Sequence, residues 1–327
     1  MHFDYCIIDE ACQILEPAIL GPILKSDKFV LCGDPNQLSP LIKSNRTEVR
    51  HNNEVSNNNN IDYNYSLFDR LLINFPEYST KLIKQFRMNK DIMLLSNKCI
   101  YNGEMICGSS TLKNKQISVS TDDINTLYKN SKYFKNNSWL LSAFQPNKSV
   151  LFYDYDIYYK SIQEKSIEDE QNSNNIVLNH SVFRLDVDKL RINIIEVEII
   201  KLIIFNLKIL YNDLNNVAVI TPFKNQEEYL LKELNTLFSF NNVYTIDKAQ
   251  GLEKDIIIVS FVLLEPNTHL LRNSQRINVA FTRPRYKLII VGLFNTLIKI
   301  DNLTNYLKII EEYNWCEKIC DIIKYNN

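Results

Sequence analysis

The sequence predicts an α/β protein built on a parallel sheet. Short apolar runs rich in Ile and Val recur along the chain, and segments with helical patterns separate them. Continuous apolar runs are typical of strands buried on both faces of a parallel sheet. Strands that alternate with helices are connected by crossovers and therefore run parallel.

The first apolar run, Tyr5–Ile8, predicts a buried strand that ends directly in Asp9 and Glu10. Ligands of α/β sheets bind at the carboxyl ends of the strands, so these acids lie where nucleotide chemistry would need them. Asp9 could hold Mg²⁺, and Glu10 could orient and deprotonate an attacking water. The alternative is that Asp9 only caps a helix that begins near Ala11.

A second buried strand is predicted at Lys28–Cys32, and the segment Gly33–Pro40 (GDPNQLSP) follows it. Gly33 would allow a close approach of the backbone, and Asp34 and Gln37 stand just beyond the strand end. The alternative is an ordinary Gly-Asp-Pro turn.

The elements between the first and second halves of the chain are less regular. Asn45–Ser66 is rich in Asn and predicts a disordered surface insertion. A short helix is predicted at Leu67–Leu72 and a strand at Thr80–Lys84. Asn89 can cap a helix whose buried stripe is Ile92, Leu95, Ser96 and Cys99.

The second half repeats the strand and helix alternation, whereas residues 111–148 and 155–190 show no clear pattern. The predicted strands are Ser149–Tyr153, Val217–Ile220, Val243–Ile246, Ile256–Val262 and Leu288–Val291. The predicted helices are Asn193–Tyr211, Asn225–Phe238 and Arg276–Arg283. Residues 301–327 read as helical, with Trp315 and Tyr325 as packing residues.

Composition sets limits on the class of protein. The 327 residues suffice for about two domains, and 45% are hydrophobic. A net charge of −1 excludes nucleic-acid binding through bulk charge, so such binding needs a local groove. Seven cysteines at irregular spacings favour a reducing compartment, and Cys316 and Cys320 read as buried thiols. No apolar run reaches the roughly 18 residues of a membrane span, and no signal peptide is visible, so we expect a soluble intracellular protein.

One glycine-rich stretch could be mistaken for a phosphate loop. Gly103–Ser110 (GEMICGSS) begins with the spacing of that motif, but Ser stands where the motif needs Lys. The segment before it reads as a helix, whereas a phosphate loop follows a strand. The sequence therefore predicts that these 327 residues contain no phosphate loop.

Six short motifs follow one another in the order of a known family. IIDEACQ, GDPNQLSP, QFRM, TPFKNQ, TIDKAQGLEKDIIIVS and RINVAFTRPRYKLIIVG resemble the successive motifs of superfamily 1 helicases. The chain is most similar to the helicase half of the eukaryotic DNA replication ATP-dependent helicase/nuclease family, on the strength of ILEPAILGP, RMNKDIMLLSNKCIYNGEMICGS and DKAQGLEKDIIIVSFV. The match covers about Met1–Ser110 and Val217–Gly292.

The resemblance implies a P-loop NTPase type of fold. Residues 1–80 would be part of a first RecA-like domain, 81–148 connecting helices, 149–300 a complete second RecA-like domain, and 301–327 a C-terminal helical segment. ATP and Mg²⁺ would bind between the two domains. The resemblance further implies a nuclear ATP-dependent helicase of DNA replication and repair. It would move 5′ to 3′ on single-stranded DNA, with a single-strand-binding protein as a further partner and no membrane.

The resemblance also implies roles for individual residues. Asp9 and Glu10 would be the Mg²⁺ and water-activating pair, Gln37 the γ-phosphate sensor, and Arg87 and Arg283 the arginine fingers. The residues expected around the nucleotide are Gly33, Asp34, Gln250, Gly251, Glu253 and Arg276. As a finger, Arg283 would face an open cleft, so its removal should barely change stability.

The chain departs from the family in several respects. It contains neither the phosphate loop nor the nuclease domain, so we expect it to be inactive by itself. None of its seven cysteines is assigned to the family's iron–sulfur cluster, and we expect no such cluster here. Pro284 follows Arg283 where the family has a small residue, so the helix could end there. Two alternatives remain: an RNA helicase of the same branch, and a non-catalytic nucleic-acid-binding remnant.

Overall fold

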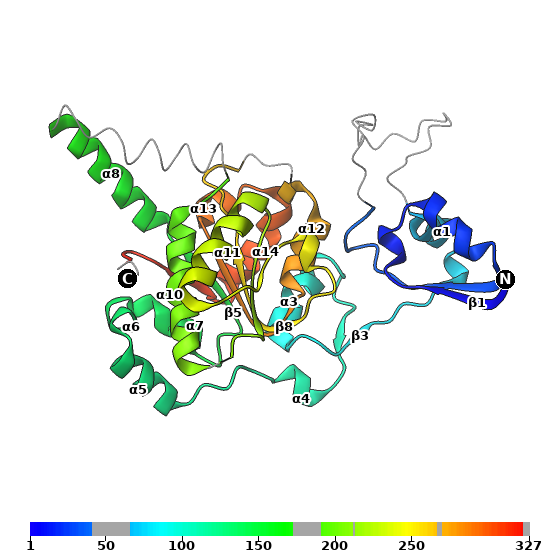
Figure 1. Cartoon of the computed structure of the whole chain (residues 1–327), viewed down its shortest axis with the longest axis horizontal. Coiled ribbons are helices and arrows are strands. Elements are labelled where there is room, and N and C mark those ends of the chain that lie inside the picture. Colours follow the sequence, from blue (N-terminus) through cyan, green and yellow to red (C-terminus); the bar gives the residue numbers. More distant parts are fainter. Residues whose placement is uncertain (41–65, 173–190, 212, 267–269, 323–327) are drawn as a thin grey trace. The chain divides into compact units, whose positions relative to one another are not determined.

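The computed structural model describes residues 1–40, 66–172, 191–211, 213–266 and 270–322. These residues form two units, Met1–Leu82 and Ile83–Asn327, which are here called unit 1 and unit 2 (Figure 1). The predicted insertion Asn45–Ser66 lies outside the described residues apart from Ser66, which is buried and begins a helix. The finer division into RecA-like domains stays a prediction.

Unit 1 is built on two parallel strands, as predicted. β1 (Phe3–Ile8) pairs with β2 (Ser26–Leu31), and Ile8 stands opposite Leu31 at the carboxyl end. Its helical elements are η1 (Ala11–Gln13), α1 (Glu16–Ile23), α2 (Leu67–Asn74) and η2 (Pro76–Tyr78). Ser66 caps α2 by accepting a hydrogen bond from Asp69 N, and the Asp69 carboxylate accepts one from Ser66 N in return.

The expected burial of these two strands is wrong. Ile8 and Leu31 pack with the small core of Ala11, Ile19 and Leu67 on one face of the sheet. Successive side chains of a strand point to opposite faces. Tyr5 and Ile7 on the other face are 61% and 71% exposed. The described residues of unit 1 therefore cover only one face of the sheet.

Unit 2 contains a six-stranded sheet in the order β10-β5-β9-β8-β6-β7, with every pair parallel. This confirms the predicted α/β class. The strands are β5 (Val150–Asp154), β6 (Val217–Thr221), β7 (Val243–Thr245), β8 (Lys254–Ser260), β9 (Pro284–Gly292) and β10 (Cys316–Lys318). All five residues of β5 and of β6 are buried, as their apolar sequences predict.

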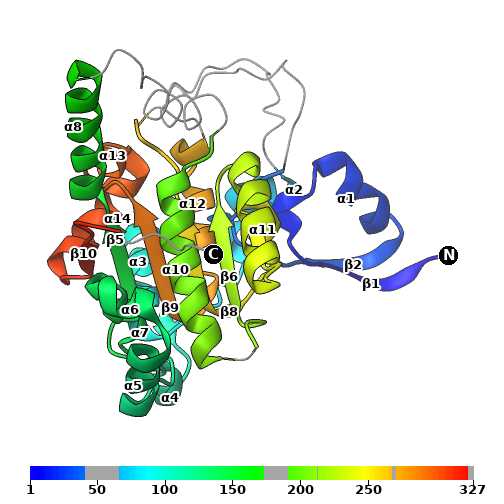
Figure 2. The ribbon, with the colours of Figure 1, turned by 60° about the vertical axis from the view of Figure 1, so that its left-hand side comes forward.

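Helices cover both faces of this sheet. Figure 2 shows α10 (Ile194–Leu210) and α11 (Lys224–Phe238) in front of the strands, with α3 (Lys90–Cys99), α12 (Ser274–Phe281) and α14 (Asp301–Glu312) behind them. The remaining helical elements are α4 (Ser110–Lys113), α5 (Thr121–Asn130), α6 (Lys132–Asn136), η3 (Ser138–Leu140), α7 (Leu141–Phe144), α8 (Asp156–Asn172), η5 (Asp247–Ala249), η6 (Leu270–Arg272) and α13 (Phe294–Leu297). No helix within the described ranges is long and apolar enough to cross a membrane.

Three local predictions need correction. The strand expected at Thr80–Lys84 is only the two-residue β3 (Lys84–Gln85), which pairs with β4 (Ile106–Cys107). The predicted C-terminal helical segment contains α14 but then forms β10, because Cys316–Lys318 pairs with the edge of β5. Cys316 therefore lies on a strand, and the prediction that Cys316 and Cys320 are buried thiols is wrong, because Cys316 is half-buried and Cys320 is exposed. Trp315 is buried as expected, and Tyr325 lies outside the described residues.

Candidate functional site

The two predicted motifs of unit 1 lie side by side because their strands pair. Cys32 N donates a hydrogen bond of 2.8 Å to Ile8 O, and Ala11 N donates one of 2.9 Å to Cys32 O. The residues that follow β1 and those that follow β2 thus meet at one edge of the sheet. This is the carboxyl edge, where sequence reasoning placed them.

The acidic pair occupies a strained turn. Glu10 has a left-handed backbone with φ of 51°, which is uncommon for a residue other than glycine. Gln13 Nε2 donates to Glu10 Oε2 at 3.0 Å, so the carboxylate is oriented by its own turn. Asp9 Oδ1 accepts from Glu10 N, while η1 begins at Ala11, and Glu10 is its N-cap residue, with no side-chain cap hydrogen bond. The alternative in which Asp9 caps a helix is therefore wrong.

The segment after β2 is a close-packed turn. A Cβ at position 33 would lie 2.6 Å from Cys12 Sγ, so any other residue there would require Cys12 to shift. Asp34 Oδ1 accepts from Asn36 N at 2.9 Å, the pattern of an Asx turn. Asp34 Oδ2 accepts from Gln37 Nε2 at 3.0 Å. The ordinary turn is thus present, and it carries Gln37 at the same edge as the acidic pair; a sensor role for Gln37 stays a prediction.

The donor set of this edge suits Mg²⁺ that arrives with a nucleotide. In the described ranges no group of three or more His, Cys, Asp or Glu side chains could hold a metal ion. Mg²⁺ usually binds through one or two carboxylates together with waters and substrate phosphates. Asp9, which is exposed and next to Glu10, fits that pattern. Binding of Mg²⁺ at Asp9 stays a prediction, and the exposed Asp9 carboxylate is chemically suited to it.

In unit 2 the structure brings Arg87 and Glu253 together although they lie 166 positions apart in the sequence. Arg87 Nε lies 3.1 Å from Glu253 Oε2, and Arg87 Nη1 donates to Thr282 O at 3.1 Å. Both charged side chains are about one-third exposed. The predicted finger Arg87 is therefore held by the predicted nucleotide-site residue Glu253 and by the backbone next to Arg283.

Arg283 differs from its prediction. Its side chain is only 2% exposed, so it does not face open solvent. Arg283 Nε donates to Val279 O and Nη2 donates to Thr282 Oγ1, each at 3.0 Å. The reason is local: α12 ends at Phe281, and the guanidinium folds back over the carboxyl end of that helix, where a cation is favoured.

The other predicted nucleotide-site residues of unit 2 lie on the loop before β8 or are joined to it. Arg276 Nε donates to Asp247 Oδ1 at 3.0 Å, which joins α12 to the loop that contains Gln250 and Gly251. Gly251 has φ of 76°, a conformation that favours glycine. This loop leads into the amino end of β8, and Arg283 directly precedes β9. In unit 2, Glu253 and Arg283 thus directly precede the amino ends of β8 and β9.

Sequence reasoning missed a buried polar network at the opposite, carboxyl edge of the sheet. Glu196 on α10 is fully buried and accepts hydrogen bonds from Ser260 Oγ, Val262 N and Tyr155 Oη. Burial raises the pKa of Glu196 to about 7. Val262 has φ of 71°, which is strained for a β-branched residue. The sequence signal that could have revealed this network was a Glu within the apolar run of α10.

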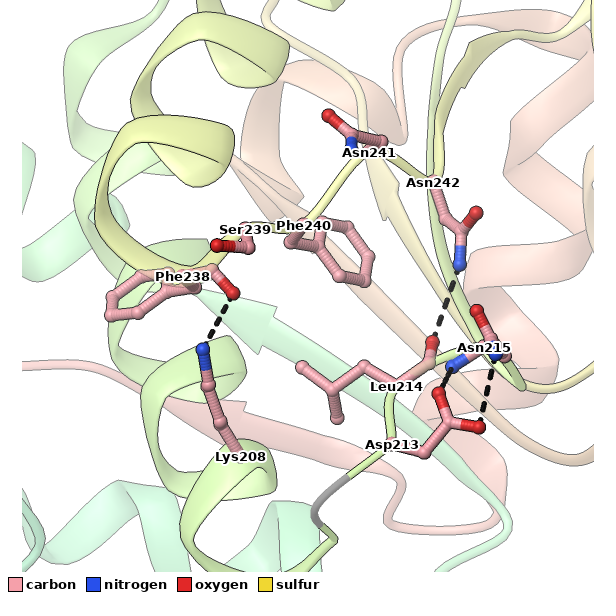
Figure 3. A pocket seen from close by; sticks show the side chains of 9 residues that line it. All are labelled: Lys208, Asp213, Leu214, Asn215, Phe238, Ser239, Phe240, Asn241 and Asn242. Carbon is pink, nitrogen blue, oxygen red and sulfur yellow. Dashed lines mark hydrogen bonds between the residues drawn. The ribbon is translucent and has the colours of Figure 1, made fainter.

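A pocket of about 250 Å³ lies where α10 and α11 end and β6 and β7 begin (Figure 3). It contains none of the predicted site residues. Its polar groups are largely satisfied by each other: Lys208 Nζ donates to Phe238 O, Asn242 Nδ2 donates to Leu214 O, and Asp213 accepts from Asn215. The pocket is therefore a packing feature of two turns.

Comparison with known proteins supports the motif-based resemblance. A family model described as an AAA domain matches residues 63–295, and a second model with the same description matches residues 1–45. The chain is 33% identical over 316 residues to the DNA replication ATP-dependent helicase/nuclease dna2 of Schizosaccharomyces pombe, covering 96% of this chain and 20% of that protein. It is 32% identical over 315 residues to DNA2 of Homo sapiens, covering 93% and 26%. The predicted resemblance is confirmed.

The similarity reaches only part of each relative. The chain spans about a fifth to a quarter of the length of these two proteins. Among solved structures, it aligns with the structure of the PRRSV helicase at a TM-score of 0.39 and 12% identity, over 90% of this chain and 36% of that chain. That structural likeness is too low to carry an argument.

Proposed function

This chain belongs to the AAA domain family, and from that premise we propose that it is the C-terminal helicase region of an ATP-dependent DNA helicase. The region would couple ATP hydrolysis to 5′-to-3′ movement on single-stranded DNA during replication and repair in the nucleus. The observation that carries the proposal is the similarity to helicase/nucleases along 96% of the chain. The grouping of predicted residues within each unit supports it.

Each group has a role in phosphoryl transfer. ATP with Mg²⁺ would supply the transferable phosphoryl group and the cation that neutralises it. Asp9 would hold the cation, Glu10 would take a proton from the attacking water, and Gln37 would hydrogen-bond the terminal phosphate. The hydrogen bond from Gln13 Nε2 holds the Glu10 carboxylate in place before substrate arrives.

The arginines of unit 2 supply positive charge in a planar, bidentate form. Arg87 contacts the terminal phosphate, and Arg283 contributes charge beside it. Glu253, Gln250, Gly251 and Arg276 are the further nucleotide and DNA residues of unit 2, and Gly33 and Asp34 are those of unit 1. An arginine finger is worth about 10³-fold or more in turnover, so these residues should dominate the rate.

The direct test is an ATPase assay on the full-length gene product with single-stranded DNA. We expect DNA-stimulated turnover of roughly 1 s⁻¹ or faster. Glu10→Gln should lower it by about 10²-fold or more, as expected for loss of a general base. Glu77→Gln, which changes an exposed acid of the same unit, is the matched control. Equal turnover in the two variants would remove Glu10 from the mechanism.

The 327-residue chain alone is a second test. It contains no GxxxxGK[ST] sequence, so it lacks the Lys and the backbone nest that cradle nucleotide phosphates. We expect its turnover to stay well below roughly 1 s⁻¹, and faster turnover would contradict this expectation.

Replacing the DNA by single-stranded RNA of matched length tests the RNA helicase alternative. Stronger stimulation by RNA would favour that alternative over the DNA helicase. If the full-length product binds either strand without using ATP, the non-catalytic alternative is correct.

A further inference from the structure

We propose that Arg285, to which no role has been assigned above, is a positioning residue that orients the finger Arg87 through the Glu253 carboxylate. The inference rests on the proposed function and deepens it, because it adds a residue that sets the geometry of the same site. It does not require Arg285 to touch substrate.

Arg285 is anchored at both ends of its guanidinium. Nε lies 2.5 Å from Glu253 Oε1, and Nη1 lies 3.2 Å from Asp255 Oδ1. Both acids belong to the first part of β8 and the loop before it, and Arg285 lies on the neighbouring strand β9. The Arg285 backbone also accepts a hydrogen bond from Asn89 N, the cap residue of α3. Arg285 therefore joins the three segments that surround Arg87.

The two oxygens of Glu253 are divided between two arginines. Oε1 accepts from Arg285 and Oε2 accepts from Arg87 Nε. Because Arg285 fixes one oxygen, the other is presented to Arg87 in a defined direction. Thr282 O fixes the Nη1 side of the same guanidinium. Two of the three nitrogens of Arg87 are thus held by the protein.

The third nitrogen of Arg87 is left for a ligand. Within the described residues Arg87 Nη2 makes no hydrogen bond, and the side chain is 31% exposed. A guanidinium held by the protein at Nε and Nη1 keeps the donors of Nη2 available for an anionic oxygen such as that of a phosphate.

Opposite charges stabilise the contacts among Arg285, Glu253 and Arg87. Partial burial opposes ionisation of Glu253, but the hydrogen bonds from Arg285 and Arg87 lower its pKa, so the carboxylate stays ionised. The two arginines balance Glu253 and Asp255. Without Arg285, Glu253 would keep only Arg87 as a partner, and the pair would gain freedom to move together.

The expected kinetic effect follows from this geometry. A finger acts mainly on the transition state, so a loosened finger lowers kcat more than it raises KM. We expect Arg285→Ala to lower kcat of the full-length gene product about tenfold, with KM for ATP changed less than about twofold. Arg285→Lys keeps the charge but cannot contact Glu253 and Asp255 in the same way, so its kcat should fall between those of the wild type and Arg285→Ala.

The decisive experiment is a double-mutant cycle with Arg87. Arg87→Ala should lower kcat about 10³-fold, and the double variant should be no slower than Arg87→Ala alone, because Arg285 acts only through Arg87. Rates are divided by the folded fraction measured in thermal melts. Lys148→Ala is the control: it breaks the Lys148–Glu317 pair, of similar length at 3.1 Å and similar exposure, and should leave kcat unchanged.

The outcomes separate this inference from the proposed function. If the wild type has no ATPase activity, the proposed function fails and the inference fails with it. If the wild type is active, an unchanged kcat per folded Arg285→Ala molecule overturns the inference alone. Additive losses in the double variant would also overturn it, since Arg285 would then act independently of Arg87.

Discussion

The apolar strands of the two units have similar sequences but different surroundings. In β1 the side chain of Ile7 is 71% exposed, whereas in β8 that of Ile257 is fully buried. Helices cover both faces of the unit 2 sheet, while the described residues of unit 1 cover one face of theirs. An apolar run therefore predicts a strand, but the number of packed layers decides whether that strand is buried.

The units also differ in the sheet edge that holds the predicted site residues. In unit 1, Asp9 and Gly33 follow the carboxyl ends of paired strands. In unit 2, Glu253 and Arg283 precede the amino ends of β8 and β9, and the carboxyl edge is filled by the network around Glu196. The rule that places ligands at carboxyl ends describes Asp9 and Gly33 of unit 1 but not Glu253 and Arg283 of unit 2.

The largest effect is expected when the same substitution, Ile→Ala, is made in a strand of each unit. Ile257→Ala should cost about 3 kcal/mol of unfolding free energy, since it leaves a cavity in a closed core. Ile7→Ala should cost less than about 0.5 kcal/mol, as for surface positions. Hydrogen exchange measured by mass spectrometry resolves each unit. Equal losses would break the comparison by showing that Ile7 is covered.

A second test concerns the burial of Arg283. We expect Arg283→Ala to cost about 2 kcal/mol, in the range for loss of hydrogen bonds from a buried charged group, because its bonds to Val279 and Thr282 are lost. This reverses the expectation from sequence. Arg272→Ala, at an exposed position just before α12, should be nearly neutral. Urea unfolding of both variants measures these costs. An unchanged urea midpoint for Arg283→Ala would support the prediction from sequence that Arg283 is an exposed finger.

A third test uses pH to examine the closed carboxyl edge of unit 2. Burial raises the pKa of Glu196 to about 7 in the folded protein, from an ordinary value of 4.5. Between these values the folded state binds more protons than the unfolded state, so stability should fall as pH rises from about 4.5 to about 7.

Glu196→Gln should remove this contribution to the pH dependence. Burial also raises the pKa of Asp154, to about 6, but that group is present in both proteins. The difference between the urea midpoints of wild type and variant, plotted against pH, therefore isolates Glu196. A flat difference would mean that Glu196 ionises normally and that the network is open to water.

The smallest expected effect lies in unit 1. Ser66→Ala removes the helix cap of α2 and its reciprocal contact with Asp69, which should cost about 1 kcal/mol. Asn74→Ala, at the exposed end of the same helix, is the control. Hydrogen exchange of α2 measures both. A loss above that of Ile257→Ala would show that unit 1 depends more on local capping than on its small core.

Much of the local structure was determined by the sequence itself. The apolar runs at Tyr5–Ile8 and Ile256–Val262 specified strands, since their pattern fits a pleated backbone in either unit. Asn89 specified the start of α3, because its side chain accepts a hydrogen bond from Ile92 N three residues later. Such signals act over a few residues and can be read without knowing the fold.

Tertiary structure alone decided which surfaces and charges meet. The sequence does not show that β10 extends the sheet, because a three-residue strand is defined by its pairing with β5. Nor does it show that Arg283 is buried or that Arg285 reaches Glu253, since the first depends on where α12 ends and the second on contact between β8 and β9. Both contacts depend on neighbours that packing brings close. Spacing in the sequence does not show which partner a long, flexible charged side chain reaches.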